Sequence, residues 1–284
     1  LWANIATHYL PGKGLTLGVR LPPMRLSVVV PCFNEEGNIA GVVRQAAEVG
    51  RRLASELQIV VVDDGSTDDT AGVLSALQGV IPELTIVTHL RNRGYGAAVR
   101  SGLDRASMDF VFLTDGDGQF DLRELPAAAL MLRDHDMVAG YRIDRSDGLW
   151  RGVWGRAWTA LVNRVLGLGV RDANCAFKLL PRSLVRSADL RSDGALISAE
   201  LLYEARRSEL SLGECAVSHY QRRTGRQTGA SLRVIVIAFW ELLRFVSSRP
   251  DCGPFAWPRT SSHRLPETDP QRLRSVAATR RRQR

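Results

Sequence analysis

The feature that most constrains this chain is a pair of short apolar runs that each end on carboxylates and glycine. The first, Val60–Val62, leads into Asp63-Asp64-Gly65, and the second, Phe110–Leu113, leads into Asp115-Gly116-Asp117. Apolar runs of this length predict buried parallel strands. Because ligands of open α/β sheets bind beyond the carboxyl ends of such strands, both acidic clusters should face one crevice.

The acidic clusters favour a divalent cation. Carboxylates gathered in a crevice repel one another unless a cation joins them, and carboxylate oxygens are hard ligands that suit Mg²⁺ or Mn²⁺. As plain turn residues, Asp115 and Asp117 would stand beside Asp64 without a partner. The pattern therefore predicts an enzyme that acts on a nucleotide-linked substrate, with Asp115 and Asp117 holding the metal.

Strand and helix patterns alternate through the first half of the chain. We expect strands at 26–30, 59–63, 84–89, 109–114 and 137–141. Helical periodicity predicts helices at about 37–54, 67–79, 95–107 and 122–134. This alternation indicates an α/β fold with a mostly parallel, doubly wound sheet and helices on both faces. Beyond residue 148 the pattern changes to helices and loops.

The net charge of +8 is concentrated at the two ends of the chain. Residues 249–284 hold nine Arg against three acidic residues, Lys13 and Arg20 supply the rest, and segment 24–248 is formally neutral. No nucleic-acid partner is therefore expected. The tail fits either a solvated disordered end or an attraction to an anionic surface. We expect an N-terminal extension over 1–23, the α/β domain over 24–231, an amphipathic helix over 232–248 and a basic disordered tail over 249–284.

The expected helix at 232–248 bears on membrane binding. It is shorter and more charged than a spanning helix requires. Arg233, Glu241, Arg244 and Ser248 fall on one side at helical spacing, which leaves a wide apolar face. That face fits either packing on the core or contact with a membrane interface, and both interpretations remain open.

Three tryptophans recur at helical spacing earlier in the second half, at positions 150, 154 and 158. This spacing predicts a packed stripe on one face of a helix. A groove that faces lipid is the alternative.

Four motifs occur in a fixed order along the chain. They are Pro31-Cys32-Phe33-Asn34-Glu35-Glu36, Asp63-Asp64-Gly65-Ser66, Asn92-Arg93-Gly94-Tyr95-Gly96 and Asp115-Gly116-Asp117-Gly118-Gln119. In this order and spacing, over about residues 25–248, the chain resembles the family 2 glycosyltransferases of the GT-A fold. Within that family it is most similar to the dolichyl- and polyprenyl-phosphate mannosyl- and glucosyltransferases.

The resemblance implies a role for each motif on the donor side. Pro31, Asn34 and Glu35 would border the nucleoside pocket, and Asp64 would contact the nucleotide. Gly94 would belong to the nucleotide-sugar site, although both Gly94 and Gly96 also fit a plain backbone turn. Asp115 and Asp117 match the family's D-x-D motif, with Asp117 favoured as the direct metal ligand. Gln119 matches a glutamine that joins the metal shell.

Two later segments resemble the acceptor side of the same branch. Asp172–Lys178 is similar to its D-x-x-(S/C)-G-F-(R/K) segment, with Ala176 in place of the glycine. Residues 222–231 look like its R-x-x-G-x-S loop, where an arginine meets acceptor phosphate. This loop is expanded, so that Arg222, Arg223 and Arg226 compete for the role. Arg142 follows the fifth strand and is either a catalytic cation or an ion-pair partner of the acidic cluster.

The resemblance and the residue types together predict a metal-dependent inverting transfer. A hexose would move from a nucleotide-diphosphate sugar of the GDP-mannose or UDP-glucose class to a polyprenyl phosphate. An ionised lipid phosphate needs no general base, whereas a hydroxyl acceptor would. The alternative is a family 2 enzyme that glycosylates a soluble small molecule or glycan, with Asp172 or Glu200 as base. The lipid acceptor implies a cytoplasmic, peripheral protein on the inner face of the cell membrane.

Overall fold

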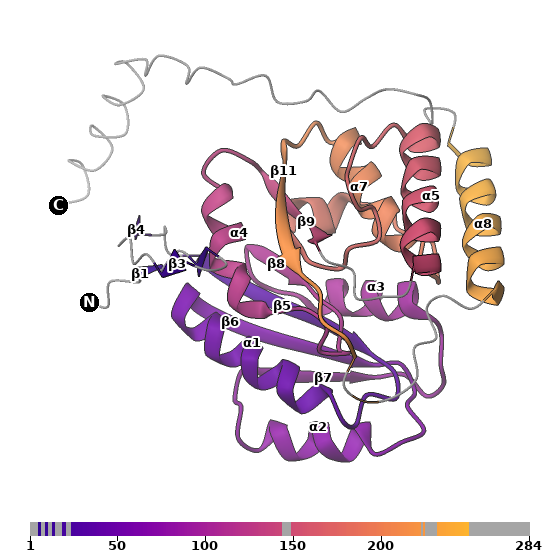
Figure 1. Cartoon of the computed structure of the whole chain (residues 1–284). Coiled ribbons are helices and arrows are strands. Elements are labelled where there is room, and N and C mark those ends of the chain that lie inside the picture. The colour runs from indigo at the N-terminus through magenta and orange to yellow at the C-terminus, as the bar shows by residue number, and fades with distance from the viewer. Residues whose placement is uncertain are drawn as a thin grey trace, which may run out of the picture.

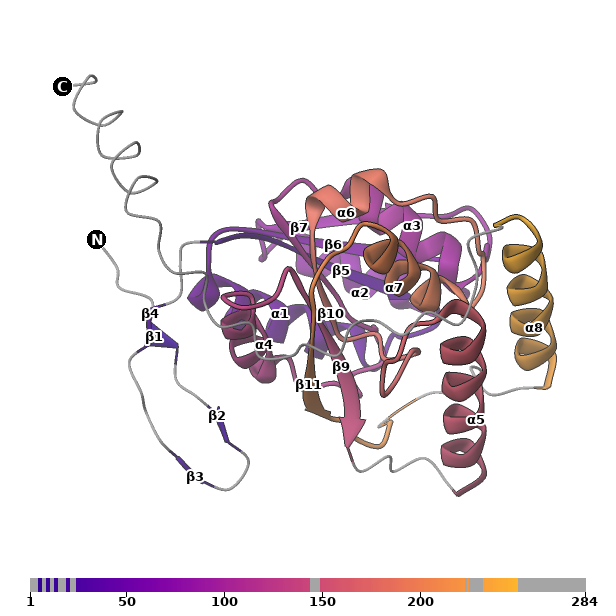
Figure 2. The same ribbon diagram turned by 90° about the horizontal axis from the view of Figure 1, so that it is seen from above.

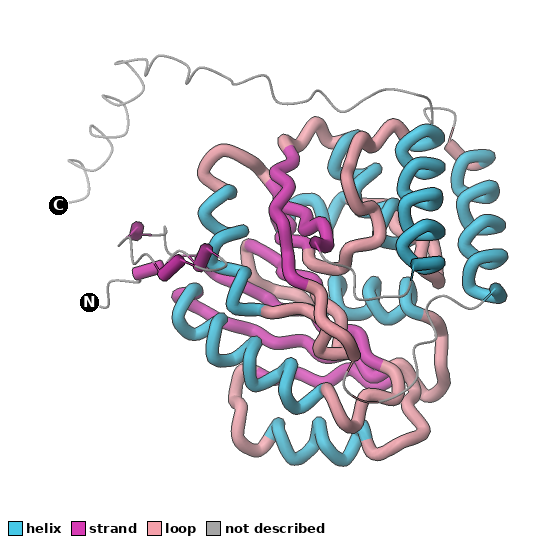
Figure 3. The backbone as a smooth tube through the Cα atoms, in the orientation of Figure 1, coloured by secondary structure: helices cyan, strands magenta, loops and turns pink. Residues whose placement is uncertain are grey.

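The computed structural model describes residues 24–143, 149–222, 224 and 232–249, together with four two-residue strands in the N-terminal extension. Those strands form two small antiparallel pairs. They are β1 (Ile5–Ala6) with β4 (Val19–Arg20), and β2 (Tyr9–Leu10) with β3 (Lys13–Gly14). The main body is a layered α/β unit with helices on both sides of a central sheet (Figures 1 and 3).

The central sheet has seven strands in the order β11-β9-β10-β8-β5-β6-β7. All neighbours pair in parallel except β10, which is antiparallel to both β8 and β9. The strands are β5 (Met24–Cys32), β6 (Ala54–Asp63), β7 (Leu84–Thr88), β8 (Phe110–Leu113), β9 (Met137–Ile143), β10 (Lys178–Pro181) and β11 (Leu212–Ser218). The predicted mostly parallel, doubly wound sheet is confirmed.

Eight α-helices and one 3-10 turn accompany the sheet in the described part of the chain. They are α1 (Ile39–Leu53), α2 (Thr70–Gln78), α3 (Tyr95–Arg105), η1 (Leu122–Glu124), α4 (Leu125–Met131), α5 (Leu149–Leu166), α6 (Arg182–Ser187), α7 (Ile197–Arg207) and α8 (Leu232–Ser247). Side chains of α1, α2 and α4 pack in one hydrophobic cluster, and those of α3, α5, α6, α7 and α8 in a second. The view in Figure 2 places α5 and α8 side by side at one end of the molecule.

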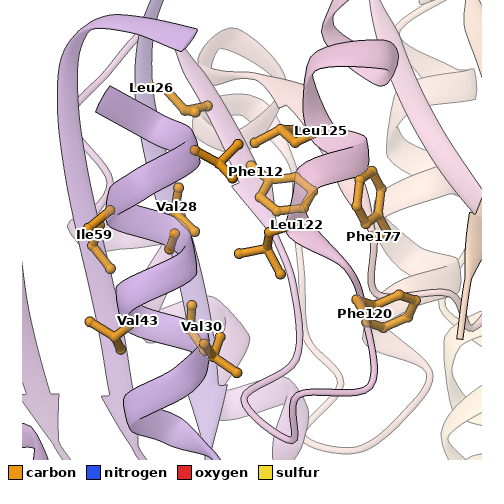
Figure 4. Close-up of a cluster of buried hydrophobic side chains, with 14 of the residues drawn as sticks. Leu26, Val28, Val30, Val43, Ile59, Phe112, Phe120, Leu122, Leu125 and Phe177 are labelled. Carbon is orange, nitrogen blue, oxygen red and sulfur yellow. The ribbon is translucent and has the colours of Figure 1, made fainter. Parts of the chain in front are cut away.

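The central strands carry apolar runs where they are buried on both faces. On β5, Val28 and Val30 point into the first cluster while Val29 points into the second. Neighbouring side chains of a strand point to opposite faces, so a strand covered on both sides needs an unbroken apolar run. Figure 4 shows the first cluster, where Phe112 and Phe177 meet edge to face with ring centroids 4.6 Å apart.

Two strands in the second half were not predicted from the sequence. The expectation of helices and loops beyond residue 148 is wrong for β10 and β11. β10 is four residues long and carries a lysine, and β11 is an edge strand of alternating partial burial without a β-branched run. Neither pattern stands out from a loop in sequence, because short strands are recognised by apolar runs or strict alternation.

The α8 helix is packed on one side and exposed on the other. Ala238, Leu242 and Phe245 are buried, whereas Trp240 is 69% and Leu243 52% exposed. One side of this helix therefore packs on the core, and contact of the exposed side with a membrane stays a prediction. No helix in the described ranges is both long and apolar enough to cross a membrane.

The C-terminal end of α8 is anchored by Arg249. This residue is buried, forms an ion pair with Glu204, donates to the Asp189 carbonyl at 2.7 Å and lies over the Phe245 ring at 4.8 Å. The sequence assigned Arg249 to the disordered tail, so that boundary lies one residue too early. The rest of the predicted tail, 250–284, lies outside the described residues.

The tryptophan stripe on α5 is only partly packed. Trp158 lies 6.4 Å from Phe239 of α8, measured between ring centroids, and its indole N–H donates to the Asn174 amide oxygen at 3.0 Å. Trp154 is 58% exposed. The side chain of Trp150 lies outside the described residues.

Candidate active site

The predicted acidic clusters meet at one edge of the sheet. Because β8, β5 and β6 are parallel neighbours, their carboxyl ends lie side by side. Backbone hydrogen bonds continue past these ends, from the Gly116 N–H to the Pro31 carbonyl at 3.2 Å and from the Asp64 N–H to the Cys32 carbonyl at 2.9 Å. The loops that carry Asp64 and Asp115 are thus joined around the end of β5.

Asp115 carries a carboxylate oxygen, Oδ1, that is buried and has no hydrogen-bond partner among the described residues. Burial and the neighbouring charge of Asp117 raise the pKa of Asp115 to about 7. A hydrogen bond from Tyr95 and two nearby cations oppose this rise. Because an unpartnered buried carboxylate is unfavourable, a cation placed here would be strongly stabilised.

Asp117 and Gln119 shape the turn that follows β8. The Gln119 N–H donates to Asp117 Oδ1 at 3.0 Å, and Gln119 Nε2 donates to the Tyr220 carbonyl at 2.8 Å. Since this second bond uses the amide nitrogen, the amide oxygen is the Gln119 atom that can bind a cation. The contact with Tyr220 also ties the turn to the chain that follows β11.

These residues fit a divalent cation that shares its ligands with a phosphate. No three His, Cys, Asp or Glu side chains gather into a metal site within the described ranges. Mg²⁺ commonly uses one or two carboxylates and completes its shell with water and substrate phosphate. Asp115 and Asp117 supply two carboxylates, one of them with an unpartnered oxygen, and Gln119 adds an amide oxygen.

Asp64 is almost fully enclosed by protein donors. Its Oδ1 lies 2.6 Å from His89 Nδ1 and accepts from the Arg93 N–H at 2.9 Å. Its Oδ2 accepts from the Gly94 N–H at 2.8 Å, and the side chain is buried. Gly94 has φ +99°, and a Cβ there would lie 2.5 Å from the Asp193 carbonyl oxygen. Asp64 therefore holds the loop that contains Gly94, and this loop admits only glycine there.

Asn34 links the first two donor motifs. It adopts φ +57°, its N–H donates to Ser66 Oγ at 2.9 Å, and its Oδ1 accepts from the Thr67 N–H at 2.8 Å. Asparagine tolerates this left-handed conformation better than most residues. The loops that follow β5 and β6 are therefore fixed to one another at the predicted nucleoside pocket.

Glu35 forms an ion pair with Arg222, a contact that sequence spacing does not indicate. Arg222 Nη2 lies 2.6 Å from Glu35 Oε1, and both side chains are largely buried. Asn38 donates to the other Glu35 oxygen at 2.8 Å. Burial raises the pKa of Glu35, while the hydrogen bond from Asn38 and the charge of Arg222 oppose that rise. Arg222, a candidate ligand of acceptor phosphate, is thus held by a carboxylate.

The segment after β11 joins the turn after β8 to the loop after β5. It contacts Gln119 through Tyr220, and Arg222 Nε donates to the Thr224 carbonyl at 2.7 Å. Thr224 Oγ1 in turn donates to Asn38 Oδ1 at 2.8 Å. We refer to the described residues 219–222 and 224 as the strap. Arg223 and Arg226, the other two candidates, lie outside the described residues.

Arg142 pairs with Asp172. Its Nε donates to Asp172 Oδ2 at 2.7 Å and its Nη2 to Oδ1 at 3.0 Å, a bidentate contact with little exposed surface. The charge of Arg142 also acts on Asp115. Arg142 is therefore an ion-pair partner of Asp172 that also lies within electrostatic reach of Asp115, and its catalytic role stays a prediction.

Lys178 is a fully buried cation behind the site. Its Nζ donates to the Ala173 carbonyl at 3.5 Å and also to the Cys175 carbonyl. Burial lowers the pKa of Lys178. Together with Arg142, it places positive charge beside Asp115. Sequence reasoning quoted Lys178 as part of a motif but gave it no role, although a lysine inside an apolar run is itself a signal.

Tyr95 and His89 were also missed. Tyr95 hydrogen-bonds Asp115, and His89 contacts Asp64. Both follow the carboxyl end of β7, whose strand lies beside β6. Their position at the sheet edge that carries the acidic clusters was the available signal.

The sequence profile of one known family, described as "Glycosyl transferase family 2", matches residues 27–188. This range holds all four donor motifs. The chain belongs to glycosyl transferase family 2. The predicted family is confirmed.

Two curated relatives of this family member act, by name, on polyprenyl phosphates. Dodecaprenyl-phosphate galacturonate synthase of Rhizobium johnstonii is 33% identical over 211 residues, which cover 71% of this chain and 61% of the relative. Undecaprenyl-phosphate 4-deoxy-4-formamido-L-arabinose transferase of Sodalis glossinidius is 31% identical over 57% of this chain and 50% of the relative. The chain thus matches only about half to three fifths of their lengths.

Solved structures confirm the GT-A fold. Glucosyl-3-phosphoglycerate synthase of Mycobacterium tuberculosis, in complex with phosphoglyceric acid, superposes with a TM-score of 0.62 at 21% identity, covering 79% of this chain and 80% of that one. The same enzyme with Mn²⁺ and UDP-glucose gives a TM-score of 0.59 at 23% identity, covering 77% of this chain and 79% of that one.

Proposed function

We propose that this family 2 member transfers a sugar from a nucleotide-diphosphate sugar to a polyprenyl phosphate, with inversion at the sugar carbon. The observation that carries the donor half is the buried, unpartnered oxygen of Asp115 beside Asp117 at the carboxyl ends of β5, β6 and β8. The names of the two curated relatives support the acceptor half.

Asp115, Asp117 and Gln119 would hold Mg²⁺ or Mn²⁺ at this edge. Such a cation neutralises the charge that develops on the leaving pyrophosphate. Pro31, Asn34 and Glu35 would border the nucleoside, because their loop is fixed to that of Ser66 at the same sheet edge. Asp64 and Gly94 would shape the adjoining wall.

The acceptor is proposed to be a phosphate because, among the described residues, both candidate bases for a hydroxyl acceptor, Asp172 and Glu200, are held by other groups. Asp172 is held by Arg142 in a bidentate contact. Glu200 is 1% exposed and accepts from the Arg191 N–H at 2.9 Å and from Ser192. A phosphate monoester is largely ionised at neutral pH, since its second pKa is about 6, so its oxygen can attack without proton removal. Arginine side chains would position it.

For the acceptor phosphate, we propose Arg223 or Arg226 as direct ligands and Arg142 as an electrostatic contributor. Arg222 would act by holding the strap against Glu35, and it would reach phosphate only by giving up that carboxylate. A glycosyltransferase with a soluble hydroxyl acceptor remains the second candidate. It would need either Asp172 or Glu200 to be released from its present partners.

We also propose that the protein binds a membrane surface through α8, on the cytoplasmic side, where a lipid acceptor would be presented. Val236, Ile237, Phe239, Trp240 and Leu243 are exposed on this helix, and Trp154 is exposed on α5, the helix that lies beside α8 in Figure 2. Monomeric proteins rarely expose contiguous apolar groups unless these meet a partner. Aromatic side chains on a helix with a packed opposite face are suited to a membrane interface.

A panel assay tests the proposed activity. Purified protein would be incubated with UDP- and GDP-linked hexoses and hexuronic acids, a short polyprenyl phosphate and Mn²⁺ or Mg²⁺. We expect labelled sugar to enter the lipid fraction with at least one donor, and we expect EDTA to abolish this. Parallel tubes would replace the lipid phosphate with the matching polyprenol or with a soluble sugar. Transfer only to a hydroxyl acceptor would favour the second candidate.

A further inference from the structure

Three polar side chains that are distant in sequence form a row behind residues 92–96, which we call the donor loop. Ser101 lies on α3, His89 follows β7, and Asp64 follows β6. His89 Nε2 lies 2.9 Å from Ser101 Oγ, and His89 Nδ1 lies 2.6 Å from Asp64 Oδ1. His89 and Asp64 are 8% and 3% exposed. A buried polar row of this kind is stable only when its members are mutually satisfied.

The partners of Asp64 define the tautomer of His89. Asp64 accepts from the Arg93 and Gly94 N–H groups, one at each carboxylate oxygen, so both oxygens act as acceptors. His89 Nδ1 must then carry the proton that faces Asp64, and Nε2 accepts from the Ser101 hydroxyl. His89 thereby fixes the orientation of the Asp64 carboxylate, in the manner of an imidazole held between a hydroxyl and a carboxylate.

The oriented Asp64 carboxylate in turn holds the loop at residues 92–96. The two N–H groups that donate to it belong to the residues immediately before Tyr95. The N–H of Gly96, the residue after Tyr95, donates to the Asp193 carbonyl at 2.7 Å, so the loop is also held from its other side. Tyr95, the first residue of α3, hydrogen-bonds Asp115.

We propose that His89, supported by Ser101, is a positioning residue that places Asp115 through Asp64 and Tyr95. This inference rests on the proposed function only where it concerns the cation. It assigns Asp64 to the support of the donor loop. The row sets the geometry of the acidic edge before any ligand arrives, and its loss would loosen residues 92–96 and weaken cation binding by Asp115.

The first test measures the loop alone. Amide hydrogen exchange would be followed over residues 90–96 in the wild-type protein, His89→Leu and His89→Asn. Leu removes both side-chain hydrogen bonds, whereas the amide nitrogen of Asn can replace Nδ1. We expect His89→Leu to speed exchange of the Arg93 and Gly94 amides at least about tenfold, because they depend on an oriented Asp64. His89→Asn should stay within about threefold of wild type.

His135→Leu is the matched control. His135 precedes β9, at the end of the sheet opposite the site, and its Nδ1 is buried without a partner among the described residues. Its substitution should leave exchange in residues 90–96 unchanged. Ser101→Ala, a milder change on a half-buried side chain, should give a small acceleration and remains informative should His89→Leu not fold. Wild-type exchange in both Ser101→Ala and His89→Leu would overturn the proposal.

The second test measures Mn²⁺ binding with UDP present, by calorimetric titration and without any acceptor. We expect His89→Leu and Tyr95→Phe each to raise the Mn²⁺ dissociation constant about tenfold. If both act through one route, the double variant should be no weaker than about the weaker single variant. Effects that multiply would overturn the route through Tyr95, and so would unchanged affinity in His89→Leu. Absence of Mn²⁺ binding by the wild type would instead contradict the proposed function.

Discussion

The donor edge, formed by the loops at the carboxyl ends of β5, β6 and β8, encloses polar side chains, whereas the surface of α8 exposes apolar ones. At the donor edge, polar side chains are enclosed: Asp64, Glu35 and Gln119 are all buried and hydrogen-bonded. On α8, apolar side chains are exposed, with Trp240 at 69% and Leu243 at 52%. Exposed apolar side chains of this kind are unfavourable in a protein without a partner, and so is the unpartnered buried oxygen of Asp115 at the donor edge.

This contrast indicates which kind of partner the donor edge and the α8 surface could each bind. The donor edge would suit a polar, anionic ligand with its cation, because its carboxylates are already oriented by protein donors. The α8 surface would suit an apolar partner, because its opposite side is already packed through Leu242 and Phe245. A reaction between a nucleotide sugar and a lipid phosphate would join these two environments in one molecule.

The largest effect that would test the donor side comes from Asp117→Asn. Removing a ligand charge from the cation that stabilises the leaving pyrophosphate should lower turnover at least about a hundredfold. The fold should survive, because Asp117 lies in the turn after β8 and is partly exposed. Steady-state turnover and thermal unfolding would be measured together. Full, metal-dependent activity in a folded Asp117→Asn protein would break the assignment.

A smaller effect is expected from the strap, which joins the turn after β8 to the loop after β5. Arg222→Ala leaves the buried Glu35 carboxylate without its cation, so it should raise the Michaelis constants of both donor and acceptor, by about tenfold for the acceptor. Arg223→Ala and Arg226→Ala should affect only the acceptor. Double substitution with Glu35→Gln should restore part of the donor affinity that Arg222→Ala loses. Unchanged Michaelis constants in Arg222→Ala would contradict a role of the strap in donor and acceptor binding.

The pH dependence of cation binding is a further test of the donor edge. Burial and the charge of Asp117 raise the pKa of Asp115 to about 7 in the absence of metal. Below that pH the carboxyl is protonated and a cation must displace the proton, so the Mn²⁺ dissociation constant should rise about tenfold per pH unit. Above pH 7 it should level off. Titrations between pH 5.5 and 8.5 would check this, and a flat profile would contradict the raised pKa.

The mildest effects are expected on α8, where neighbouring side chains differ in exposure. Trp240→Ser should weaken binding to anionic vesicles several-fold with little loss of stability, because Trp240 is exposed. Leu242→Ser, two residues away and 3% exposed, should instead destabilise the fold by about 2–5 kcal/mol. Vesicle sedimentation and thermal melts would separate the two. Equal vesicle binding and equal stability of the two variants would contradict the difference between the packed and exposed sides of α8.

The sequence predicted the first five strands of the central sheet because their signals are local. The apolar runs of β6 and β8 are buried on both faces and lead into carboxylates, so they are visible without the fold. The parallel order then places Asp115 near Asp64 by general rules of α/β sheets. These rules do not describe what individual side chains do, and the enclosure of Asp64 by His89 and the Gly94 N–H could not be inferred from them.

The second half was harder because its contacts are distant in sequence. Arg222 and Glu35 are 187 residues apart, and neither motif indicates that they pair. On α8, Glu241 was expected on a polar face, yet it turns inward and accepts from the Gly194 N–H at 2.7 Å. A helical periodicity shows which residues share a side but not what that side meets.

The most direct test of the central claim is the chemical structure of the product. After incubation with the preferred donor and a short polyprenyl phosphate, the lipid product would be purified and studied by ³¹P and ¹H NMR spectroscopy. The account predicts a sugar bonded through its anomeric carbon to the lipid phosphate, with a configuration opposite to that in the donor. A sugar attached to a hydroxyl group, or a retained anomeric configuration, would contradict it.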